Sequence, residues 1–309
     1  MAAPQVIVIL GPTGSGKSQL ALQVAANFAG EVVSCDSLQI YRYFDIGTAK
    51  LPPAERRAIP HHLIDIIDPD EVFTAGEYAR LARPILEQVS ARGHVPVVAG
   101  GTGFYVRALL DGLFPGPERD PALRSRLGTR EKRKPGSIHR LLRRFDPEAA
   151  RRIHPHDLPK TIRALEVCIL ARRPMTEMFR EGRAALSGYI VRKIGLWPPR
   201  EELYERLDRR TEQMFQGGLI DEVRSILARG FAPTAKPFES HGYRQALQFL
   251  NGELNLEEAV FYAQRNTRRY AKRQMTWFRQ ERDVEWFSGF GDDPRVQEAV
   301  LARMRGSLA

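Results

Sequence analysis

Apolar residues in the first third of the chain fall into short continuous runs that alternate with segments of helical spacing. The run at 6–10 ends in a glycine turn, which is typical of a strand buried on both faces of a parallel sheet. The same reasoning predicts further strands over 31–34 and 95–99, and helices over 17–28 and 77–90. This alternation of strand and helix predicts an α/β core, with a parallel sheet flanked by helices.

The pattern changes near residue 115. The stretch FPGPERDP breaks the alternation, and the chain that follows is rich in arginine, helical in spacing and without strand signals to about residue 188. YIVRKIGLWPP then predicts another strand, and after residue 200 the spacing is helical almost throughout, most clearly over 255–282. We therefore expect an α/β core formed by 1–116 and 186–309, with an all-helical insertion over 117–185.

Basic residues are concentrated in the predicted insertion. The chain of 309 residues has 47 lysines and arginines against 37 aspartates and glutamates, a net charge of +10. Residues 119–183 contain 18 of the former and 8 of the latter, so this segment carries an excess equal to the net charge of the whole chain. Such a concentration favours a surface that binds a polyanion.

Other features argue against several classes of protein. The two cysteines, Cys35 and Cys168, are far apart and form no CxxC pair, which argues against a disulfide framework and against a zinc site. The stretch MAAPQVIVILGPTG has no basic segment, and its apolar run is too short for a signal peptide or a membrane span. We therefore expect a soluble cytoplasmic protein with no membrane partner.

The segment GPTGSGKS matches the phosphate-binding pattern GxxxxGK[ST] and lies between a predicted strand and a predicted helix. The residues expected to bind phosphate are Gly11, Pro12, Thr13, Gly14, Ser15, Gly16, Lys17 and Ser18. The glycines let backbone N–H groups curl around phosphate oxygens, while Lys17 can neutralise a phosphate and Ser18 can bind Mg²⁺. The third predicted strand ends in AGGTG and lacks the metal-binding acid of many nucleotide hydrolases, for which only Asp65 or Asp68 could substitute.

An acidic residue, Asp36, follows the second predicted strand, which we expect to lie beside the strand before the phosphate loop. Ligands bind at the carboxyl ends of parallel strands, so Asp36 should face the phosphate site. Its carboxylate could accept a proton, bind a metal through water, or cap a helix. The aromatic residues that follow, Tyr41, Tyr43 and Phe44, could stack on a ligand or pack against the core, and the sequence leaves both open.

Several segments occur in the order found in one family of enzymes. They are GPTGSGKS, DSLQIYRYFDIGTAK, HHLIDIIDP, AGGTGFYVRALLDGL, IRALEV, HGYRQAL and AKRQMTWFR. In these segments the chain resembles bacterial tRNA dimethylallyltransferases, also called tRNA isopentenyltransferases, over nearly its whole length. The resemblance implies a monomer with a P-loop NTPase-like parallel-sheet core and an inserted all-helical tRNA-binding domain.

The resemblance also implies a reaction. Such enzymes transfer a dimethylallyl group from dimethylallyl diphosphate to the N6 amine of adenosine 37 of tRNA, next to the anticodon, without ATP. The loop would then hold the donor diphosphate, with Mg²⁺ on Ser18. The implied catalytic residues are Thr13, Lys17, Ser18, Asp36 and Arg210, with Arg206 as an alternative to Arg210. Asp36 would accept the proton of the amine, and alignment with the allylic carbon should matter more than base strength.

The implied contacts with the anticodon stem-loop are spread over both predicted domains, because the adenine must be flipped out into a pocket while the RNA around it is held. They are Asp36, Ser37, Leu38, Gln39, Thr102, Arg124, Pro159, Lys160, Thr161, Ile162, Arg163, Glu239, Ser240, His241, Gly242, Tyr243, Arg244, Lys272, Arg273 and Gln274. His241 departs from the family, which usually has a small apolar residue there. We expect Lys272 and Arg273 to contact phosphate and Trp277 to pack inward.

Three other functions share some of these features. A prenyltransferase of free adenine nucleotides has the loop and the acid but needs no grip on RNA, so the basic insertion argues against it. A small-molecule kinase with an inserted lid would use ATP in the same loop. A nucleic-acid-binding module could carry the loop as a vestige, but a complete GxxxxGKS motif beside Asp36 argues against that function.

Overall fold

The computed structural model describes residues 3–56 and 59–306. They form two compact units, one made of the chain up to Leu109 and from Leu186 onward, the other of Leu110–Ala185. The predicted insertion, 117–185, differs from the second unit mainly at its start. The units are described separately.

The first unit is built on a six-stranded parallel sheet. Its strands are β1 Gln5–Leu10, β2 Gly30–Ser34, β3 His61–His62, β4 Val95–Ala99, β5 Ile190–Trp197 and β6 Val284–Ser288. They lie in the order β3-β2-β4-β1-β5-β6, and every pairing is parallel. The predicted α/β fold class is confirmed.

From the sequence, β2 was expected to lie beside β1, the strand before the phosphate loop, and this expectation was wrong. Strand β4, not β2, lies beside β1, and Val97 of β4 pairs with Ile7 on one side and with Val32 of β2 on the other. The connection from β1 to β2 passes through a whole helix, so it can skip one strand position, which β4 then fills. The carboxyl ends of β1, β4 and β2 still meet at one edge of the sheet, because all three strands are parallel.

Two strands were missed. Strands β3 and β6 are the two edges of the sheet, and neither has a buried residue. Edge strands are short and half exposed, so they lack the continuous apolar run by which the central strands were predicted. After residue 200, the regular elements of the described chain are helices and the strand β6.

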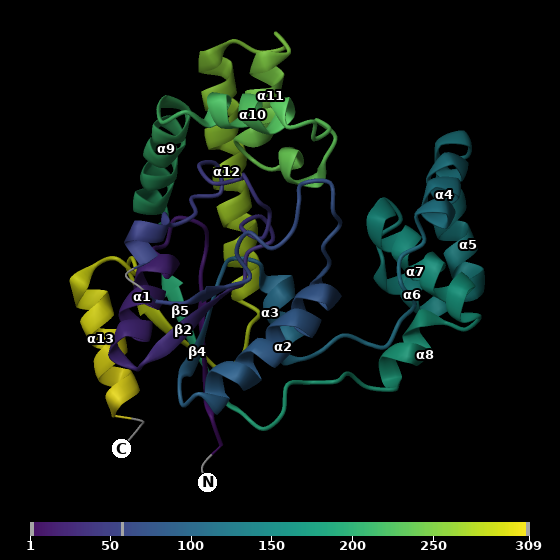
Figure 1. Cartoon of the computed structure of the whole chain (residues 1–309). Helices are drawn as coiled ribbons and strands as arrows, with labels where there is room; N and C mark the ends of the chain where they lie inside the picture. The colour runs from purple at the N-terminus through teal and green to yellow at the C-terminus, as the bar shows by residue number, and fades with distance from the viewer. Residues whose placement is uncertain (1–2, 57–58, 307–309) are drawn as a thin grey trace. The chain divides into compact units, whose positions relative to one another are not determined.

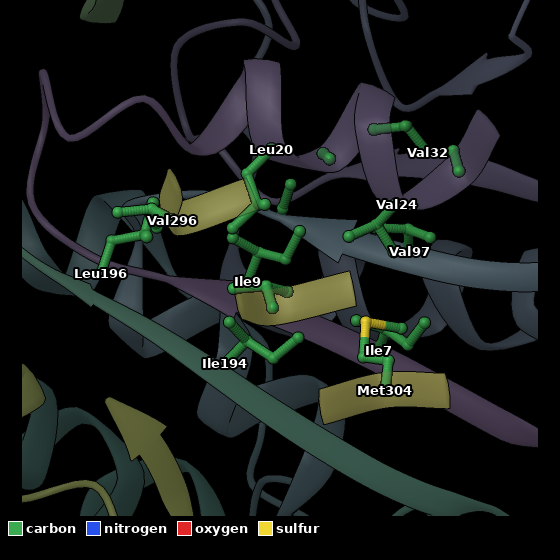
Figure 2. Close-up of a cluster of buried hydrophobic side chains, with 14 residues drawn as sticks. Ile7, Ile9, Leu20, Val24, Val32, Val97, Ile194, Leu196, Val296 and Met304 are labelled. Carbon is green, nitrogen blue, oxygen red and sulfur yellow. The ribbon is translucent and has the colours of Figure 1, made fainter. Parts of the chain in front are cut away.

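A core cluster lies between the sheet and two helices from opposite ends of the chain, α1 Lys17–Asn27 and α13 Pro294–Arg305 (Figures 1 and 2). Figure 2 shows side chains of strands and helices meeting there, among them Ile7 and Ile9 of β1, Ile194 of β5, Leu20 and Val24 of α1, and Val296 and Met304 of α13. Alternate residues of β1 point to the same face, which is why Ile7 and Ile9 share this cluster. The packing fixes where α1 begins, and with it the phosphate loop.

Further helices complete the unit. They are α2 Ala75–Ala91, α3 Gly103–Leu110, α9 Arg200–Gln216, α10 Leu219–Ala228, α11 Tyr243–Leu250 and α12 Leu256–Phe278, with short 3-10 turns at Pro53–Arg56 and Lys236–Glu239. Helix α12 begins at a capping box, in which the Asn255 side chain accepts a hydrogen bond from Glu258 N and the Glu258 carboxylate accepts one from Asn255 N.

The aromatic residues after Asp36 pack into this helical layer. Tyr41 is 2% exposed and Phe44 is fully buried, with the Phe44 ring centroid 4.6 Å from that of Tyr243. Tyr43 lies against Phe231. Of the two interpretations left open by the sequence, core packing is the one the structure supports.

The second unit is helical throughout. Its helices are α4 Pro121–Arg133, α5 Ser137–Phe145, α6 Pro147–Arg152, α7 Leu158–Ala171 and α8 Met175–Arg180. Three of them begin at an aspartate whose side chain accepts a backbone N–H of the first turn, namely Asp120, Asp146 and Asp157. The unit has a core of its own around Ile138, Leu142 and Leu165.

Candidate active site

The phosphate loop joins β1 to α1. Gly14 and Gly16 have φ angles of +79° and +82°, which favour glycine, and Gly16 is also the N-cap of α1. A Cβ atom on Gly16 would lie 2.5 Å from the Asp292 carboxylate and 2.7 Å from Gly291 N, so the loop is packed closely against the chain before α13. The first turn of α1 has no acidic residue, and its free N–H groups can therefore bind an anion.

Two cations and one anion meet at this loop. Lys17 Nζ donates to Pro12 O at 2.7 Å, and Arg210 of α9 donates to Thr13 Oγ1 at 2.8 Å. Burial is the main cause that lowers the pKa of Lys17 to about 8; the attraction of Asp36 opposes this shift, and Arg210 contributes to it. Burial also lowers the pKa of Arg210 to about 10, with Arg206 acting in the same direction. A bound anion would offset the free-energy cost of keeping these two charges away from water.

Arg206, the alternative to Arg210, has a different partner. Its guanidinium makes two hydrogen bonds to the Asp292 carboxylate, at 2.9 and 2.8 Å, and lies over the Phe290 ring. Arg206 lines the same cavity, but Arg210 is the arginine that contacts the loop.

Asp36 follows the carboxyl end of β2. The ladder between β2 and β4 continues past both strands, because Cys35 N donates to Ala99 O and Thr102 N donates to Cys35 O. The Asp36 carboxylate accepts Leu38 N at 2.9 Å and Gln39 N at 3.4 Å, so it caps a turn and not an α-helix. Asp36 also lines the cavity beside Lys17, so the carboxylate that caps the turn faces the phosphate site as well.

The cavity has a volume of about 220 Å³ and two kinds of wall. Its polar side is formed by the loop, Asp36 and Arg210. Its apolar side is formed by Met214 and Phe215 of α9 and Leu219 of α10. Sequence reasoning missed the apolar residues, although Arg210 and Met214 are spaced so as to share one face of α9.

A third side of the cavity comes from α12 and the chain before α11. His241 lies with its ring centroid 5.4 Å from that of Tyr270, and burial lowers the pKa of His241, as does Arg273. Gln274 accepts a hydrogen bond from Thr13 N and donates one to Gly101 O, both at 2.8 Å. Gln274 thus contacts the loop, and His241 and Tyr270 line the same cavity.

The structure brings 12 of the 29 residues predicted for the site to one cavity. Those that line the cavity are Thr13, Gly14, Gly16, Lys17, Ser18, Asp36, Leu38, Gln39, Arg210, His241, Gly242 and Gln274. Gly11, Pro12 and Ser15 are buried within the loop, and Ser37 N donates to Thr102 Oγ1 just outside the cavity. Asp65 and Asp68 do not line it, since they pair with Lys50 and Arg42.

Other predicted RNA contacts lie outside the cavity. Glu239, Arg244, Lys272 and Arg273 are exposed, while Ser240 is half buried. Tyr243 is fully buried, and its hydroxyl donates to Glu222 and accepts Gly47 N, so its side chain serves the core. The partly buried Trp277 lies under the Arg107 guanidinium.

In the helical unit, Arg124 and Arg163 both pair with the buried carboxylate of Glu166. The side chains of Thr161 and Ile162 are buried, and those of Pro159 and Lys160 are exposed. This segment therefore offers only part of its side-chain surface to a ligand. Both cysteines are buried and free.

A parallel sheet with a phosphate loop, and a cavity that joins two cations and a carboxylate to an apolar wall, define a P-loop enzyme. The profile of the IPP transferase family matches residues 39–281. The tRNA dimethylallyltransferase of Solibacter usitatus is 62% identical over 97% of each chain. The chain belongs to the IPP transferase family.

Solved structures are similar as well. The tRNA isopentenylpyrophosphate transferase of Bacillus halodurans is 37% identical, with a TM-score of 0.72 over 98% of this chain and 96% of that one. A eukaryotic dimethylallyltransferase solved in the course of its action on tRNA is 28% identical, with a TM-score of 0.82 over 98% of this chain and 78% of that one. Both similarities extend over nearly the whole chain, including the helical unit.

Proposed function

We propose that this protein transfers a dimethylallyl group from dimethylallyl diphosphate to the N6 amine of adenosine 37 of tRNA and releases diphosphate. The observation that carries the proposal is the cavity in which the phosphate loop, Asp36 and an apolar wall meet. The family and the names of the relatives support the same reaction.

The donor would lie with its diphosphate on the loop. Free N–H groups at the start of α1, together with Lys17 and Arg210, would hold the diphosphate and stabilise the charge that grows on it as it leaves. The prenyl chain would lie against Met214, Phe215 and Leu219, where a small apolar group is removed from water.

Mg²⁺ fits this arrangement. The exposed hydroxyl of Ser18 lines the cavity, and no group of three His, Cys, Asp or Glu side chains suited to a metal occurs in residues 3–56 and 59–306. Mg²⁺ commonly takes one or two protein ligands and completes its shell with phosphate oxygens and water, so Ser18 would be its ligand here. When bound, the ion would supply further neutralisation of the diphosphate charge.

The acceptor side is Asp36. As the amine nitrogen forms its bond to the allylic carbon, the carbon–oxygen bond to the diphosphate breaks and the proton of the amine passes to the Asp36 carboxylate. The carboxylate accepts hydrogen bonds from Leu38 N and Gln39 N, so it is oriented before the adenine enters the cavity. Thr102 would contact the adenine from the loop after β4, and His241, whose pKa is lowered by burial, lines the same cavity as Asp36.

The tRNA would be held outside the cavity by cationic surfaces. Lys272 and Arg273 are exposed on α12, and residues 119–183 of the helical unit carry the excess positive charge of the chain. Such contacts neutralise phosphates, and they predict RNA binding that weakens as salt rises. Among the described residues, no helix is both long and apolar enough to cross a membrane.

The test is to incubate the protein and Mg²⁺ with labelled dimethylallyl diphosphate and either unmodified tRNA or free AMP, with no ATP. We expect label in tRNA and none in AMP. Label in AMP alone would identify a nucleotide prenyltransferase, and turnover only with ATP would identify a kinase. Either result would overturn the proposal.

A further inference from the structure

Gln274 joins the phosphate loop to two other parts of the molecule. It lies on α12 and is 6% exposed. Its side-chain oxygen accepts Thr13 N and its side-chain nitrogen donates to Gly101 O, each at 2.8 Å. The bridge therefore links α12 to the loop after β1 and to the loop after β4.

The chemistry of the two partners suits an amide at this position. A backbone N–H only donates and a carbonyl only accepts, so the bridging side chain must carry one acceptor and one donor. Leucine would offer neither, and ionised glutamate would place an acceptor against the Gly101 carbonyl. The fit is also close, because a Cβ atom on Gly101 would lie 2.4 Å from Gln274 Nε2.

Thr13 is held from two helices at once. Its N–H is bound by Gln274 of α12, and its hydroxyl accepts from Arg210 of α9. The helices are themselves joined where Arg268 pairs with Asp208. The conformation of the phosphate loop thus depends on where α12 lies.

The same helix carries groups suited to RNA. Lys272 and Arg273, next to Gln274 in sequence, are exposed, and Tyr270, one turn away, lines the cavity. Gln274 is buried, and its amide also interacts with Tyr270, so little of the side chain is open to RNA. An RNA that docks on α12 would act on the loop through Gln274.

We propose that Gln274 is a positioning residue that holds the phosphate loop in its diphosphate-binding form and couples diphosphate binding to RNA binding on α12. This inference rests on the proposed function for the identity of the two ligands. Coupling of this kind is reciprocal, since each ligand must change the affinity for the other by the same factor.

The experiment measures the Kd of inorganic diphosphate, with Mg²⁺, in the presence and absence of an unmodified anticodon stem-loop RNA. For the unchanged protein we expect the RNA to tighten diphosphate binding severalfold. In Gln274→Leu we expect diphosphate alone to bind about tenfold more weakly, since two hydrogen bonds are lost. The RNA should bind this variant within about twofold of normal and should no longer tighten diphosphate binding.

Thr276→Val is the matched control, because Thr276 is an exposed residue of the same helix whose hydroxyl donates to Lys272 O. It should leave the diphosphate Kd unchanged. If Gln274→Leu binds diphosphate normally, or loses RNA affinity alone, Gln274 is not a positioning residue. If RNA does not affect diphosphate binding to the unchanged protein, the coupling is refuted even where prenyl transfer to tRNA succeeds.

If Gln274→Leu does not fold, Gln274→Glu tests whether the bridge holds the phosphate loop. A protonated carboxyl has one donor and one acceptor, as the amide has, whereas the ionised form has acceptors alone. The diphosphate Kd of Gln274→Glu, relative to the unchanged protein at the same pH, should therefore recover as the pH falls from about 8 to about 5. A ratio that does not change with pH would overturn the proposal.

Discussion

The lowered pKa of Lys17 predicts that diphosphate binding weakens in mildly alkaline solution. Burial lowers this pKa to about 8, so in the free protein the amine loses its proton near that pH. A diphosphate binds the charged form and favours it, because an adjacent anion raises the pKa of an ammonium group. The free protein above the pKa must therefore take up a proton when it binds.

The size of the effect follows from that pKa. If only the charged form binds, the apparent Kd is multiplied by about 2 at pH 8 and by about 11 at pH 9, relative to acidic solution. The direction in which each neighbouring charge shifts the pKa of Lys17 is also known. Asp36 opposes the shift of the Lys17 pKa, so Asp36→Asn should move the midpoint to lower pH, and Arg210→Ala should move it to higher pH.

The assay is calorimetric titration of inorganic diphosphate at pH 7, 8 and 9, in buffers of different ionisation enthalpy so that proton uptake is measured directly. Diphosphate has titrations of its own, and Lys17→Met supplies that baseline because it has no amine. Lys17→Arg, which stays charged, should follow the same baseline. An equal pH dependence for Lys17→Met and the unchanged protein would refute the role given to Lys17.

Three further changes test the site and its surroundings. Asp36→Ala should lower the single-turnover rate of prenyl transfer at least about a hundredfold and change the RNA Kd less than about threefold; equal losses would make Asp36 a binding or turn-capping residue. Arg210→Ala should weaken diphosphate binding at least about tenfold and Arg206→Ala less than about threefold, by calorimetry, because only Arg210 contacts the loop; the reverse order would assign the diphosphate contact to Arg206. Gly47→Ala should lower the free energy of unfolding by about 1–3 kcal/mol in urea titrations, since its Cβ would lie 2.4 Å from the Tyr243 ring; an unchanged midpoint would mean that the ring moves aside freely.

The central strands and the loop were predictable because their signals are local. Continuous apolar runs mark β1 and β4, and the glycine spacing of the loop is sufficient to place it at the start of α1. The position of Asp36 at the cavity was predicted correctly from a wrong strand order. The wrong strand order did not affect the predicted position of Asp36, because the carboxyl ends of all parallel strands lie at one edge of the sheet.

The apolar wall and the bridge by Gln274 were not predictable in the same way. Met214 and Phe215 follow the same helical spacing as Leu207, which is buried in the core, so only the packing of α9 decides which of them face a cavity. Gln274 contacts residues 261 and 173 positions away in the chain. No local pattern reports contacts of that range, and the resemblance pointed instead to RNA.

The missing acid after the third strand now has a structural reason. Because β4 lies between β1 and β2, its carboxyl end passes directly between the loop with Lys17 and the turn with Asp36. A Cβ atom on Gly100 would lie 2.0 Å from Cys35 O, and one on Gly101 would lie within 4 Å of both Gln274 Nε2 and Lys17 Nζ. A side chain at Gly100 would clash with the Cys35 backbone, and one at Gly101 would displace the bridge. The strand that bears a metal-binding acid in many nucleotide hydrolases is followed here by two glycines, and the carboxylate of the site comes from the turn after the neighbouring strand β2.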